Sequence, residues 1–514
     1  MLTAVVAVGL ATRGSWQSRG DTVYGASIDA QYGARLSVTP DGSTFVSYHV
    51  NNGDLLSDGD PRCFTPSVQT WSGTAYTHGY AVHSICSTAP VDTNDVGVSI
   101  DANADHWVVG GGENTSKAFI YSKDDATNHW TVTYTLAFSG APEAGFGQAV
   151  AMPYVGNHSW TGSAAVMVSA PAEVLTGPGD GVVVPYTADG SAPAAVTSID
   201  GNESGVAQDD FGDRVYYRMS NESEQMIFVV GFDTDSAYGQ AYTSVDGSSW
   251  TKKGSLISLA CTSATNGVSG AISPDGLVVA IGCPSEGVYG KVIAYEWDTD
   301  AWVPRGGGVL AGNDGSLDAK GLGTSISFNT DGTRMAVGSR ATGTTYAVVY
   351  EYTGGAWVPT IDSVDSTVTG DALSNTYPDL NGIQVALSAN GNVLTLGNPG
   401  YNIGVGDDTY GTGYVTSYVW SPSLPAPTHF FSAAPTQLPT VSPTRPPTPE
   451  PTTTSLPSSV AKHSDAVLGG SIGGVAGGLL LIAGGVYWYK FHGPGSRTLS
   501  VPFARDYHEL VGAK

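Results

Sequence analysis

Four cysteines are the residues of this chain best suited to covalent chemistry, and they fall into two local pairs. Cys63 is close in sequence to Cys86, and Cys261 is close to Cys283. Neither pair has the C-x-x-C spacing, and no histidine lies at the spacing of a zinc site, so we predict no metal centre. In an oxidising compartment each pair can form a disulfide, whereas four buried free thiols are the alternative.

Ionisable side chains form no pattern typical of an enzyme. The part of the chain before residue 421 lacks a Gly-x-Ser-x-Gly nucleophile elbow, a His-Glu-x-x-His motif and a glycine-rich phosphate loop. Carboxylates are scattered through predicted turns, so spacing assigns no acid–base pair. We predict no catalytic residue, no enzyme activity and no cofactor. Arg35 and Arg214 occupy equivalent places in the repeat described below, and they are the basis of an alternative, a glycan-active hydrolase with an arginine cluster.

Four N-x-Ser/Thr sequons precede the C-terminal region. Their asparagines are Asn114, Asn157, Asn202 and Asn221. On an extracellular surface such sequons accept N-glycans, and we predict that these asparagines do so.

Composition indicates a chain of many short strands. The protein has 514 residues, of which 68 are glycine and 13% are charged. This profile is typical of an all-β protein with tight turns and does not suit a helical bundle. The formal net charge of −25 repels phosphate backbones, so we expect no nucleic-acid partner.

The N-terminal segment, residues 1–11, is a short apolar run that ends in the small residues Gly9 and Ala11. A small-x-small ending after an apolar run is typical of a cleaved signal peptide. Because a basic segment is missing, two other interpretations stay open: a start that is truncated, or a propeller strand.

The C-terminal region predicts a stalk and a membrane anchor. Residues 421–466 are dominated by Pro, Thr and Ser, a composition typical of an extended, O-glycosylated stalk. Residues 467–489 carry no charge, and as a helix they would span about 34 Å, enough to cross a bilayer. The basic residues of the tail, 490–514, place it in the cytoplasm by the positive-inside rule. We therefore predict a single-pass type I protein in the plasma membrane or another membrane of the secretory pathway.

Two patterns in this region suggest further interactions. Glycines recur every four residues in two adjacent rows of the predicted span, which favours a helix dimer in the membrane. These glycines are Gly469, Gly473 and Gly477 in one row and Gly470, Gly474 and Gly478 in the other. In the tail, Tyr507 and Leu510 have the spacing of a tyrosine-based sorting signal.

The part between the two ends is an internal repeat of about 58 residues. Each unit reads as an alternating strand, an Asp-Gly or Asn-Gly turn, a strand apolar on both faces, a third strand and a strand that carries tryptophan. The residues that close the second strand are Tyr48, Gly110, Ser169, Gly231, Gly282, Gly338 and Gly397. The Asp-Gly and Asn-Gly pairs fit two-residue hairpins. Four antiparallel strands in each of seven units predict an all-β, seven-bladed propeller over residues 12–420.

The seventh unit ends after its third strand, and its fourth strand is missing. The segment around Trp16, before the first unit, resembles a fourth strand. We expect this segment to complete the seventh blade and close the ring, which removes its free edges. Arg19-Gly20-Asp21 lies in this segment, so we expect the tripeptide to be paired within the blade and not displayed to an integrin.

Short sequence motifs that recur at equivalent places of several units resemble the FG-GAP repeat of integrin α-chain propellers and related surface proteins. An aromatic or apolar residue followed by glycine opens four units, at Tyr32-Gly33, Phe146-Gly147, Phe211-Gly212 and Leu322-Gly323. Proline follows the second strand at Ala170-Pro171, Cys283-Pro284 and Asn398-Pro399. The resemblance covers residues 16–420 and implies a propeller at the cell surface.

Such repeats often bind calcium in an Asp-x-Asp-x-Asp-Gly loop, which is incomplete in this chain. Asp233 with Asp235, and Asp298 with Asp300, are only fragments of it and are interpreted as turn residues. Calcium held by another ligand set stays open. The segment from Ser244 to Trp250 resembles the Asp-box hairpin of sialidase propellers, a structural turn.

The sequence thus predicts a cell-surface propeller for adhesion or for recognition of an extracellular protein or glycan. Ligand contacts concentrate on loops held by a rigid scaffold, so we expect them on the loops between strands. A membrane-tethered glycan-active hydrolase and a structural coat component are the alternatives.

Overall fold

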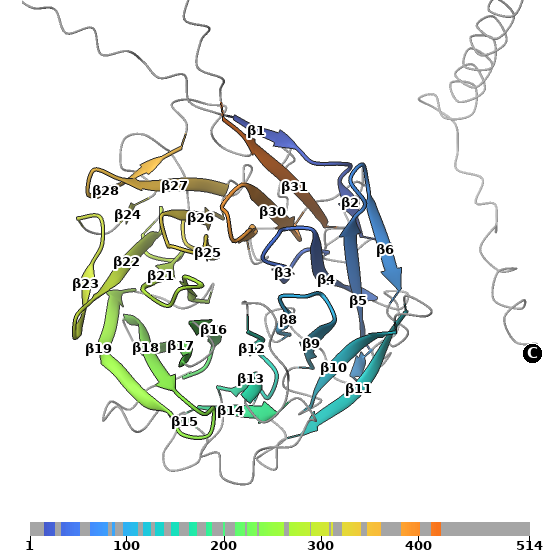
Figure 1. Ribbon diagram of the computed structural model, residues 1–514, viewed down its shortest axis with the longest axis horizontal. Helices are drawn as coiled ribbons and strands as arrows, with labels where there is room; N and C mark the ends of the chain where they lie inside the picture. The colour runs from blue at the N-terminus through green and yellow to red at the C-terminus, as the bar shows by residue number, and fades with distance from the viewer. Residues whose placement is uncertain are drawn as a thin grey trace, which may run out of the picture. The chain divides into compact units, whose positions relative to one another are not determined.

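Seven antiparallel sheets form a ring, and the innermost strand of each sheet is the first one of its repeat (Figure 1). The computed structural model describes residues 15–25, 32–51, 62–80, 85–87, 96–111, 117–124, 129–137, 145–153, 164–171, 181–187, 199–200, 211–220, 224–233, 236–261, 267–287, 289–307, 310–311, 321–340, 347–360, 382–400 and 413–422. Every helix or strand assigned in these residues is a strand. The predicted seven-bladed, all-β propeller is confirmed.

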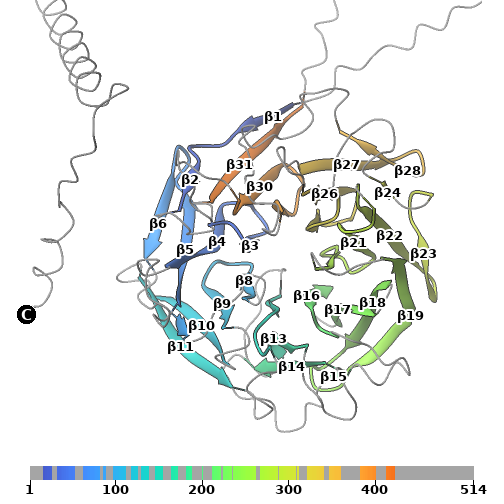
Figure 2. The same ribbon diagram turned by 180° about the vertical axis from the view of Figure 1, so that it is seen from behind.

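The blades follow one another along the chain (Figures 1 and 2). Blade 1 contains β3 (Leu36–Val38), β4 (Thr44–Asn51), β5 (Arg62–Trp71) and β6 (Tyr76–Tyr80), and blade 2 contains β8 (Val98–Ile100), β9 (His106–Gly110), β10 (Lys117–Asp124) and β11 (His129–Ala137). Blade 3 contains β12 (Val150–Ala151), β13 (Ala164–Ala170), β14 (Val182–Thr187) and β15 (Ile199–Asp200), and blade 4 contains β16 (Arg214–Ser220), β17 (Glu224–Asp233), β18 (Ser236–Ser244) and β19 (Thr251–Ala260). Blade 5 contains β20 (Ser269–Ile272), β21 (Val278–Cys283), β22 (Lys291–Asp298) and β23 (Ala301–Pro304), and blade 6 contains β25 (Ile326–Phe328), β26 (Arg334–Gly338), β27 (Ala347–Thr353) and β28 (Ala356–Pro359).

The seventh blade is built from both ends of the described chain. It contains β29 (Gln384–Leu387), β30 (Val393–Asn398) and β31 (Tyr414–Ser421), and its outermost strand is β1 (Ser15–Ser18). Trp16 is the register partner of Trp420, and the two indole rings meet edge to face with centroids 5.3 Å apart. The predicted closure of the ring by the N-terminal segment is confirmed.

Three short strands extend the sheets at their outer side. They are β2 (Val23–Tyr24), which pairs with β31, β7 (Ile85–Ser87), which pairs with β5, and β24 (Leu310–Ala311), which pairs with β22.

The hydrophobic core is divided among the spaces between neighbouring blades. Seven buried clusters each combine residues of two adjacent blades. On β21, Val279 and Ile281 pack toward blade 4, whereas Val278 and Ala280 pack toward blade 6. Successive side chains of a strand point to opposite faces, so a second strand that is apolar at every position belongs to two interfaces at once. The predicted position of these strands between neighbouring blades is confirmed.

The hairpin turns differ from the predicted two-residue form. In blade 5, Gly276 N donates to Ser273 O (2.8 Å), and Ser273 N donates to Val278 O (2.8 Å), so four residues form the loop. The Ser273 hydroxyl accepts from Val278 N (2.9 Å), and the Asp275 carboxylate accepts from Leu277 N (3.0 Å). The two-residue prediction is wrong because these side chains take the backbone donors that a tighter turn would pair with carbonyls.

The hairpin turns of four consecutive blades are joined by backbone hydrogen bonds. Asp275 N donates to Thr330 O (3.1 Å), Thr330 N donates to Ala389 O (2.8 Å), and Ala389 N donates to Pro40 O (2.6 Å). These three bonds run from blade 5 through blades 6 and 7 to blade 1. They tie the turns to one another at the end of the ring where the first strands finish.

In the fourth unit, the residue that closes the second strand lies one position earlier than predicted. Val215 pairs with Val229, so Val230 is the residue equivalent to Ser169 of blade 3. Gly231, on which the sequence was aligned, lies one position later. The equivalent position of blade 4 is occupied by valine, and the glycine that marks this position in four other blades comes one residue later here.

A cation of one blade packs on an aromatic ring of the next blade at four interfaces in the described part of the ring. The pairs are Lys253 with Trp297, Arg305 with Tyr352 and Trp357, Arg334 with Trp420, and Arg19 with Trp71. In two of them the next blade also donates a tryptophan hydrogen bond, from Trp302 to Lys253 O (2.9 Å) and from Trp357 to Arg305 O (3.1 Å). Each cation–π contact contributes about 0.5–2 kcal/mol, so the repeated contact stabilises these four interfaces between blades.

Glycine follows the cation at three of these contacts because the indole leaves no room for a side chain. A Cβ at Gly306 would lie 2.4 Å from Trp357 Cδ1, and φ is +85° there. Gly307 has nearly the same backbone angle, φ +80°, but a Cβ there would meet nothing within 4 Å.

We predict that Gly306→Ala lowers the free energy of unfolding by about 1–3 kcal/mol more than Gly307→Ala does. Both substitutions carry the strain of a positive φ, so the difference between them isolates the contact with Trp357. Denaturant unfolding of the two variants measures it. Equal losses of stability would show that the tryptophan contact does not hold blades 5 and 6 together.

Candidate functional site

The first strands of all seven blades line a central channel, and its described residues enclose two cavities of about 130 and 150 Å³. One cavity lies where the first strands begin and the other where they finish. Both are lined by apolar residues of the middle of the strands, which form a girdle between them. The girdle consists of Leu36, Val98, Val150, Val215, Ile326 and Val385.

One position per blade sets the chemistry of the cavity at the beginning of the strands. The pairing of the first strand with the second shows that this position is equivalent in all seven blades. It is the first residue of the first strand or the residue directly before it. The seven positions are Arg35, Gly97, Ala149, Arg214, Ser269, Ser325 and Gln384, and all of them line the cavity. We call them the channel ring. The predicted equivalence of Arg35 and Arg214 in the repeat is confirmed.

The two arginines of the channel ring come from opposite sides of the propeller. Arg35 belongs to blade 1 and Arg214 to blade 4, which are three blades apart in a ring of seven. Asp213 accepts a hydrogen bond from Arg214 Nη1 (3.0 Å) and another from Gln148 Nε2 (2.8 Å). The side chains of Arg214 and Asp213 are only 16% and 14% exposed. The carboxylate is thereby held between blades 3 and 4.

Electrostatic repulsion acts across the channel. Burial, and after it the Arg214 charge, lower the pKa of Arg35 from 12.5 to about 10. Arg35 therefore remains a cation at neutral pH, although the protein disfavours its charge. Of the described residues that line this cavity, the ones with charged side chains are Arg35 and Arg214.

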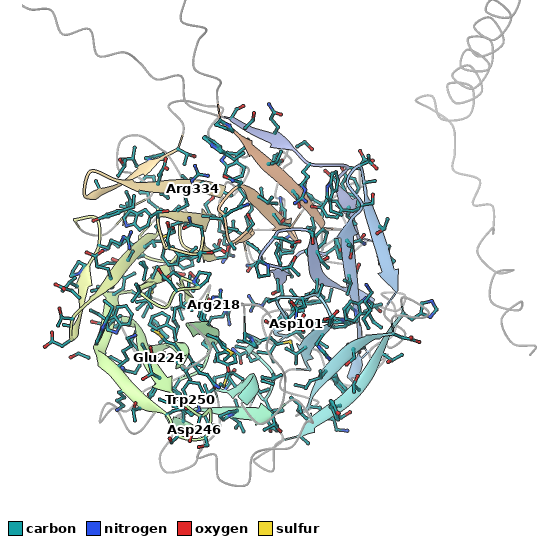
Figure 3. The ribbon with its side chains drawn as sticks, viewed as in Figure 1. Asp101, Arg218, Glu224, Asp246, Trp250 and Arg334 are labelled. Atoms are coloured by element: carbon teal, nitrogen blue, oxygen red, sulfur yellow. A yellow bond between two sulfur atoms is a disulfide. The ribbon has the colours of Figure 1, made fainter. Side chains whose placement is uncertain are left out.

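The second cavity, beyond the girdle, also receives an arginine. Arg218 lies four residues after Arg214 on β16 and lines this cavity (Figure 3). Its Nη1 donates to Tyr217 O (2.8 Å). The channel thus has an arginine-bearing cavity on each side of an apolar girdle.

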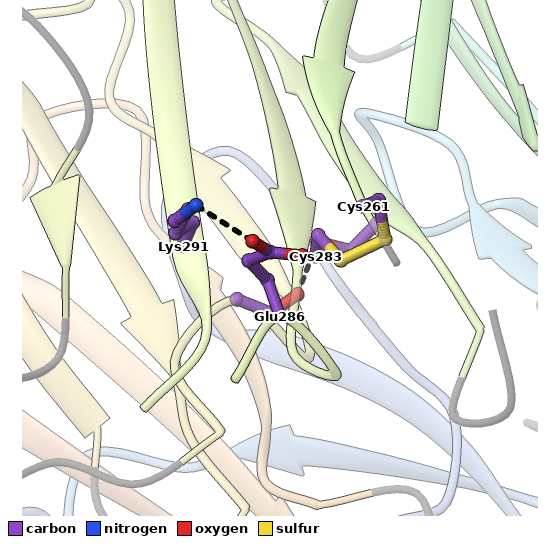
Figure 4. Close-up of a disulfide and its surroundings, with 6 residues drawn as sticks. Cys261, Cys283, Glu286 and Lys291 are labelled. Carbon is purple, nitrogen blue, oxygen red and sulfur yellow. Dashed lines mark hydrogen bonds and ion pairs between the residues drawn. A yellow bond between two sulfur atoms is a disulfide. The ribbon is translucent and has the colours of Figure 1, made fainter. Parts of the chain in front are cut away.

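One of the two predicted cysteine pairs is a disulfide in the structure (Figure 4). Cys261 follows β19 and is bonded to Cys283 at the end of β21, with a Cα–Cα distance of 5.9 Å. The bond links blade 4 to blade 5. Cys63 and Cys86 are register partners on β5 and β7, but their side chains lie outside the described part, so that disulfide stays a prediction.

The Arg-Gly-Asp tripeptide is part of the ring closure. Arg19 N donates to Ser417 O (2.8 Å), and its guanidinium donates to Gly42 O (2.6 Å) while it stacks on Trp71. The prediction that this tripeptide is paired within the fold is confirmed for Arg19.

The Asp-box segment forms the turn between β18 and β19 at the outer edge of blade 4, where Figure 3 labels Asp246 and Trp250. Asp246 accepts hydrogen bonds from Ser248 Oγ (2.7 Å) and from the backbone N–H groups of Ser248 (2.8 Å) and Ser249 (3.2 Å). The Ser248 side chain and these backbone donors hold the pKa of Asp246 below its usual range. The interpretation of this segment as a structural turn is confirmed.

Asp298 and Asp300 belong to a hairpin, as predicted. Asp298 pairs with Ala301, and Asp300 N donates to Asp298 O (2.6 Å). Asp233 ends β17, and Asp235 lies outside the described residues. Within the part of the chain that the structure describes, no group of three His, Cys, Asp or Glu side chains could hold a metal ion.

Several predicted sites lie outside the described residues. They are the sequons at Asn114, Asn157, Asn202 and Asn221, the glycine rows Gly469, Gly473, Gly477 and Gly470, Gly474, Gly478, and the tail residues Tyr507 and Leu510. The predicted signal peptide, membrane span and tail lie outside them as well, and so does the predicted stalk except for its first two residues: Ser421 ends β31, and Pro422 follows it. Among the described residues there is no helix long and apolar enough to cross a membrane.

The sequence did not single out Asp213 and Gln148, which support Arg214. Each directly follows the glycine of an aromatic-Gly pair, Phe211-Gly212 or Phe146-Gly147. That position places a side chain beside the channel ring. Polar residues immediately after these glycines are the signal that could have identified both.

Comparisons with known proteins give only distant similarities. No family model matches the chain, and no curated protein matches it. The β-propeller domain of Cps50 (Swd1) from Myceliophteria thermophila is 8% identical, with a TM-score of 0.43 over 79% of this chain and 99% of that one. A putative 6-phosphogluconolactonase from Bacteroides uniformis is 15% identical, with a TM-score of 0.42 over 69% and 89%. Sqt1 from Saccharomyces cerevisiae is 10% identical, with a TM-score of 0.41 over 80% and 100%. The FG-GAP type of the repeat stays a prediction.

We predict that the stability contributed by Asp246 depends on pH. The folded state lowers the pKa of Asp246, so its contribution is present above the ordinary value of about 3.9 and is lost as the pH falls below it. Asp246→Asn therefore lowers Tm at pH 7, and its difference from the wild type shrinks toward pH 3. Asp300→Asn, in another exposed turn, controls for the loss of one charge. A difference that is the same at pH 3 and pH 7 would contradict the prediction.

Proposed function

We propose that this protein is a single-pass surface membrane protein whose propeller recognises an extracellular protein or glycan. The observation that carries the proposal is the closed ring, with Ser15 and Ser421 as register partners in blade 7. Because the described chain enters and leaves at one blade, a C-terminal anchor would hold the propeller at a single point of its rim. Such a ring is a rigid scaffold for ligand-binding loops between strands.

The Cys261–Cys283 disulfide supports the extracellular side of the proposal. Disulfides form and persist in secreted and surface proteins and are rare in the cytosol. The predicted signal peptide, the four sequons and the uncharged segment 467–489 agree with the same compartment. The proposed orientation has residues 12–466 outside the cell and residues 490–514 in the cytoplasm.

A recognition role fits the channel better than hydrolysis does. Arg35 and Arg214 do share one cavity, as an arginine-cluster hydrolase would require. However, Asp213, the carboxylate beside Arg214, is held by hydrogen bonds from Arg214 and Gln148, as a side chain that positions the arginine would be. We therefore propose binding without turnover, and we keep the hydrolase and the coat component as outcomes of the tests below.

The proposed topology predicts which end of the full chain is accessible on intact cells. A tag inserted after residue 12 should be labelled by antibody without permeabilisation, and a tag after residue 514 only with it. Removal of residues 467–489 should release the protein into the medium, and an N-glycosidase should lower its mass. Equal inaccessibility of both tags on intact cells would contradict the surface location.

A soluble fragment, residues 12–422, tests recognition itself. We expect saturable binding to a glycan array or to intact cells, competed by an excess of untagged fragment. The same fragment is assayed on glycosidase substrates. Turnover that Arg35→Ala or Arg214→Ala abolishes would replace recognition by hydrolysis, and the absence of both binding and turnover would favour the coat component.

A further inference from the structure

A second ring of side chains lines the channel beyond the girdle. Its positions lie two residues after those of the channel ring, and the pairing of first and second strands shows that they are equivalent in all seven blades. All of them line the cavity of about 150 Å³. Four carry a hydroxyl group, and we call these four the hydroxyl ring: Ser37, Ser99, Tyr216 and Ser327. The other three are Ala151, Ala271 and Ala386.

Each hydroxyl of this ring lies at the channel because it accepts a backbone N–H group that points there. Asp101 N donates to His106 O (3.0 Å), so the backbone of Asp101 pairs with the second strand of its blade. Backbone groups of neighbouring residues point to opposite sides of a strand, so Ile100 N points away from the second strand and toward the channel. In four blades, a hydroxyl of the preceding blade accepts such an N–H group. The bonds run from Ile100 N to Ser37 Oγ (3.1 Å), from Met152 N to Ser99 Oγ (3.0 Å), from Gly270 N to the Tyr216 hydroxyl (2.9 Å) and from Leu387 N to Ser327 Oγ (2.9 Å).

These hydroxyl groups keep the capacity to bind a ligand. A hydroxyl oxygen that accepts one N–H group retains its own proton and a second lone pair. In the part of the chain that the structure describes, the protons of the hydroxyl ring donate to no protein acceptor. Ser325 of the channel ring differs, because its hydroxyl accepts from Val385 N (2.9 Å) and also donates to Ile383 O (2.8 Å). The hydroxyl ring can therefore donate to a ligand and accept from it, whereas the proton of Ser325 is already committed.

The described wall of this cavity is otherwise mostly aliphatic. It includes the girdle and the side chains of Met152 and Leu387, and Arg218, whose Nη1 donates to Tyr217 O, also lines it. A cavity of about 150 Å³ holds a molecule of the size of benzene, which has about six heavy atoms. Hydroxyl groups from four blades, with aliphatic groups between them, match a small molecule whose surface carries both O–H and C–H groups.

We propose that the hydroxyl ring binds a small neutral polyol of the size of glycerol. The hydroxyl groups of the ligand donate to and accept from the hydroxyl ring, and its C–H groups contact the aliphatic wall. An anion only accepts hydrogen bonds, so it would leave the second lone pairs of these oxygens unused. The proposal does not depend on the surface location of the protein or on what the loops between strands recognise.

The test measures binding to the purified full-length chain by calorimetry and by Tm. Glycerol is the probe, propan-1-ol has the same carbon chain with a single hydroxyl group, and mannitol has the same chemistry in a larger molecule. We expect saturable binding of glycerol, at least about threefold weaker binding of propan-1-ol, and no saturable binding of mannitol. Polyols also stabilise proteins in general, but that effect does not saturate and is shared by all variants.

Ser327→Ala is the deciding variant, and Ser325→Ala is its matched control. Each substitution removes a hydroxyl that accepts an N–H group of blade 7, from Leu387 or from Val385, so both have a similar structural effect. Only Ser327 offers its proton to the cavity of about 150 Å³. We expect Ser327→Ala to weaken glycerol binding about two- to tenfold, which is the effect of one hydrogen bond, and Ser325→Ala to bind glycerol as the wild type does.

Should Ser327→Ala fail to fold, Tyr216→Phe removes another hydroxyl of the ring and keeps the aromatic ring in place, and it should weaken glycerol binding to a similar extent. The proposal is overturned if glycerol does not bind saturably, if propan-1-ol or mannitol binds as tightly as glycerol, or if Ser327→Ala and Ser325→Ala bind glycerol equally well.

Discussion

Pairing of the first described strand with the last one is the constraint on which the propeller depends. β1 supplies the outer strand of a blade whose other three strands come from the opposite end of the chain. Trp16 and Trp420 meet across this pair, and Arg19 continues the contact to Trp71 of blade 1. Without this closure, blade 7 would expose the edge of β31, and the contacts that Arg19 makes with Gly42 and Trp71 of blade 1 would be lost. The radius of the channel, and therefore the placement of Arg35 opposite Arg214, follows from the closed ring.

Contacts between neighbouring blades then hold the ring in shape. The apolar clusters supply most of the buried surface, but they are not directional. Directional contacts supplement them: hydrogen bonds join consecutive hairpin turns from blade 5 to blade 1, and cations stack on aromatic rings at four interfaces. The disulfide adds a covalent link between blades 4 and 5. A cavity lined by one residue from each blade keeps its geometry only if the blades do not shift, so these contacts support the channel ring as well as the fold.

The sequence predicted what depends on local pattern. The number of repeats and the doubly buried second strands follow from a pattern that recurs in every unit. The closing strand at Trp16 carries the same pattern before the first unit, and Cys261 and Cys283 are close in the sequence, 22 residues apart. The sequence did not predict the four-residue turns, because Ser273 and Asp275 act through side-chain hydrogen bonds that a dipeptide rule ignores. It did not predict the contact of Arg305 with Trp357, which belong to different blades. The equivalence of Arg35 and Arg214 was visible in the repeat. That they line the same cavity follows only from the closure of the seven blades into a ring.

The most direct test of this account removes the closing strand and returns it as a separate molecule. A propeller that begins at residue 26 and ends at residue 422 lacks β1 and β2, and its Tm is measured alone and with a synthetic peptide of residues 13–25. We expect the shortened protein to unfold at a lower temperature, and the peptide to bind saturably and restore much of the loss. A peptide with Trp16→Ala should restore less. An unchanged Tm with no effect of either peptide would contradict the central claim that the N-terminal strand closes the ring.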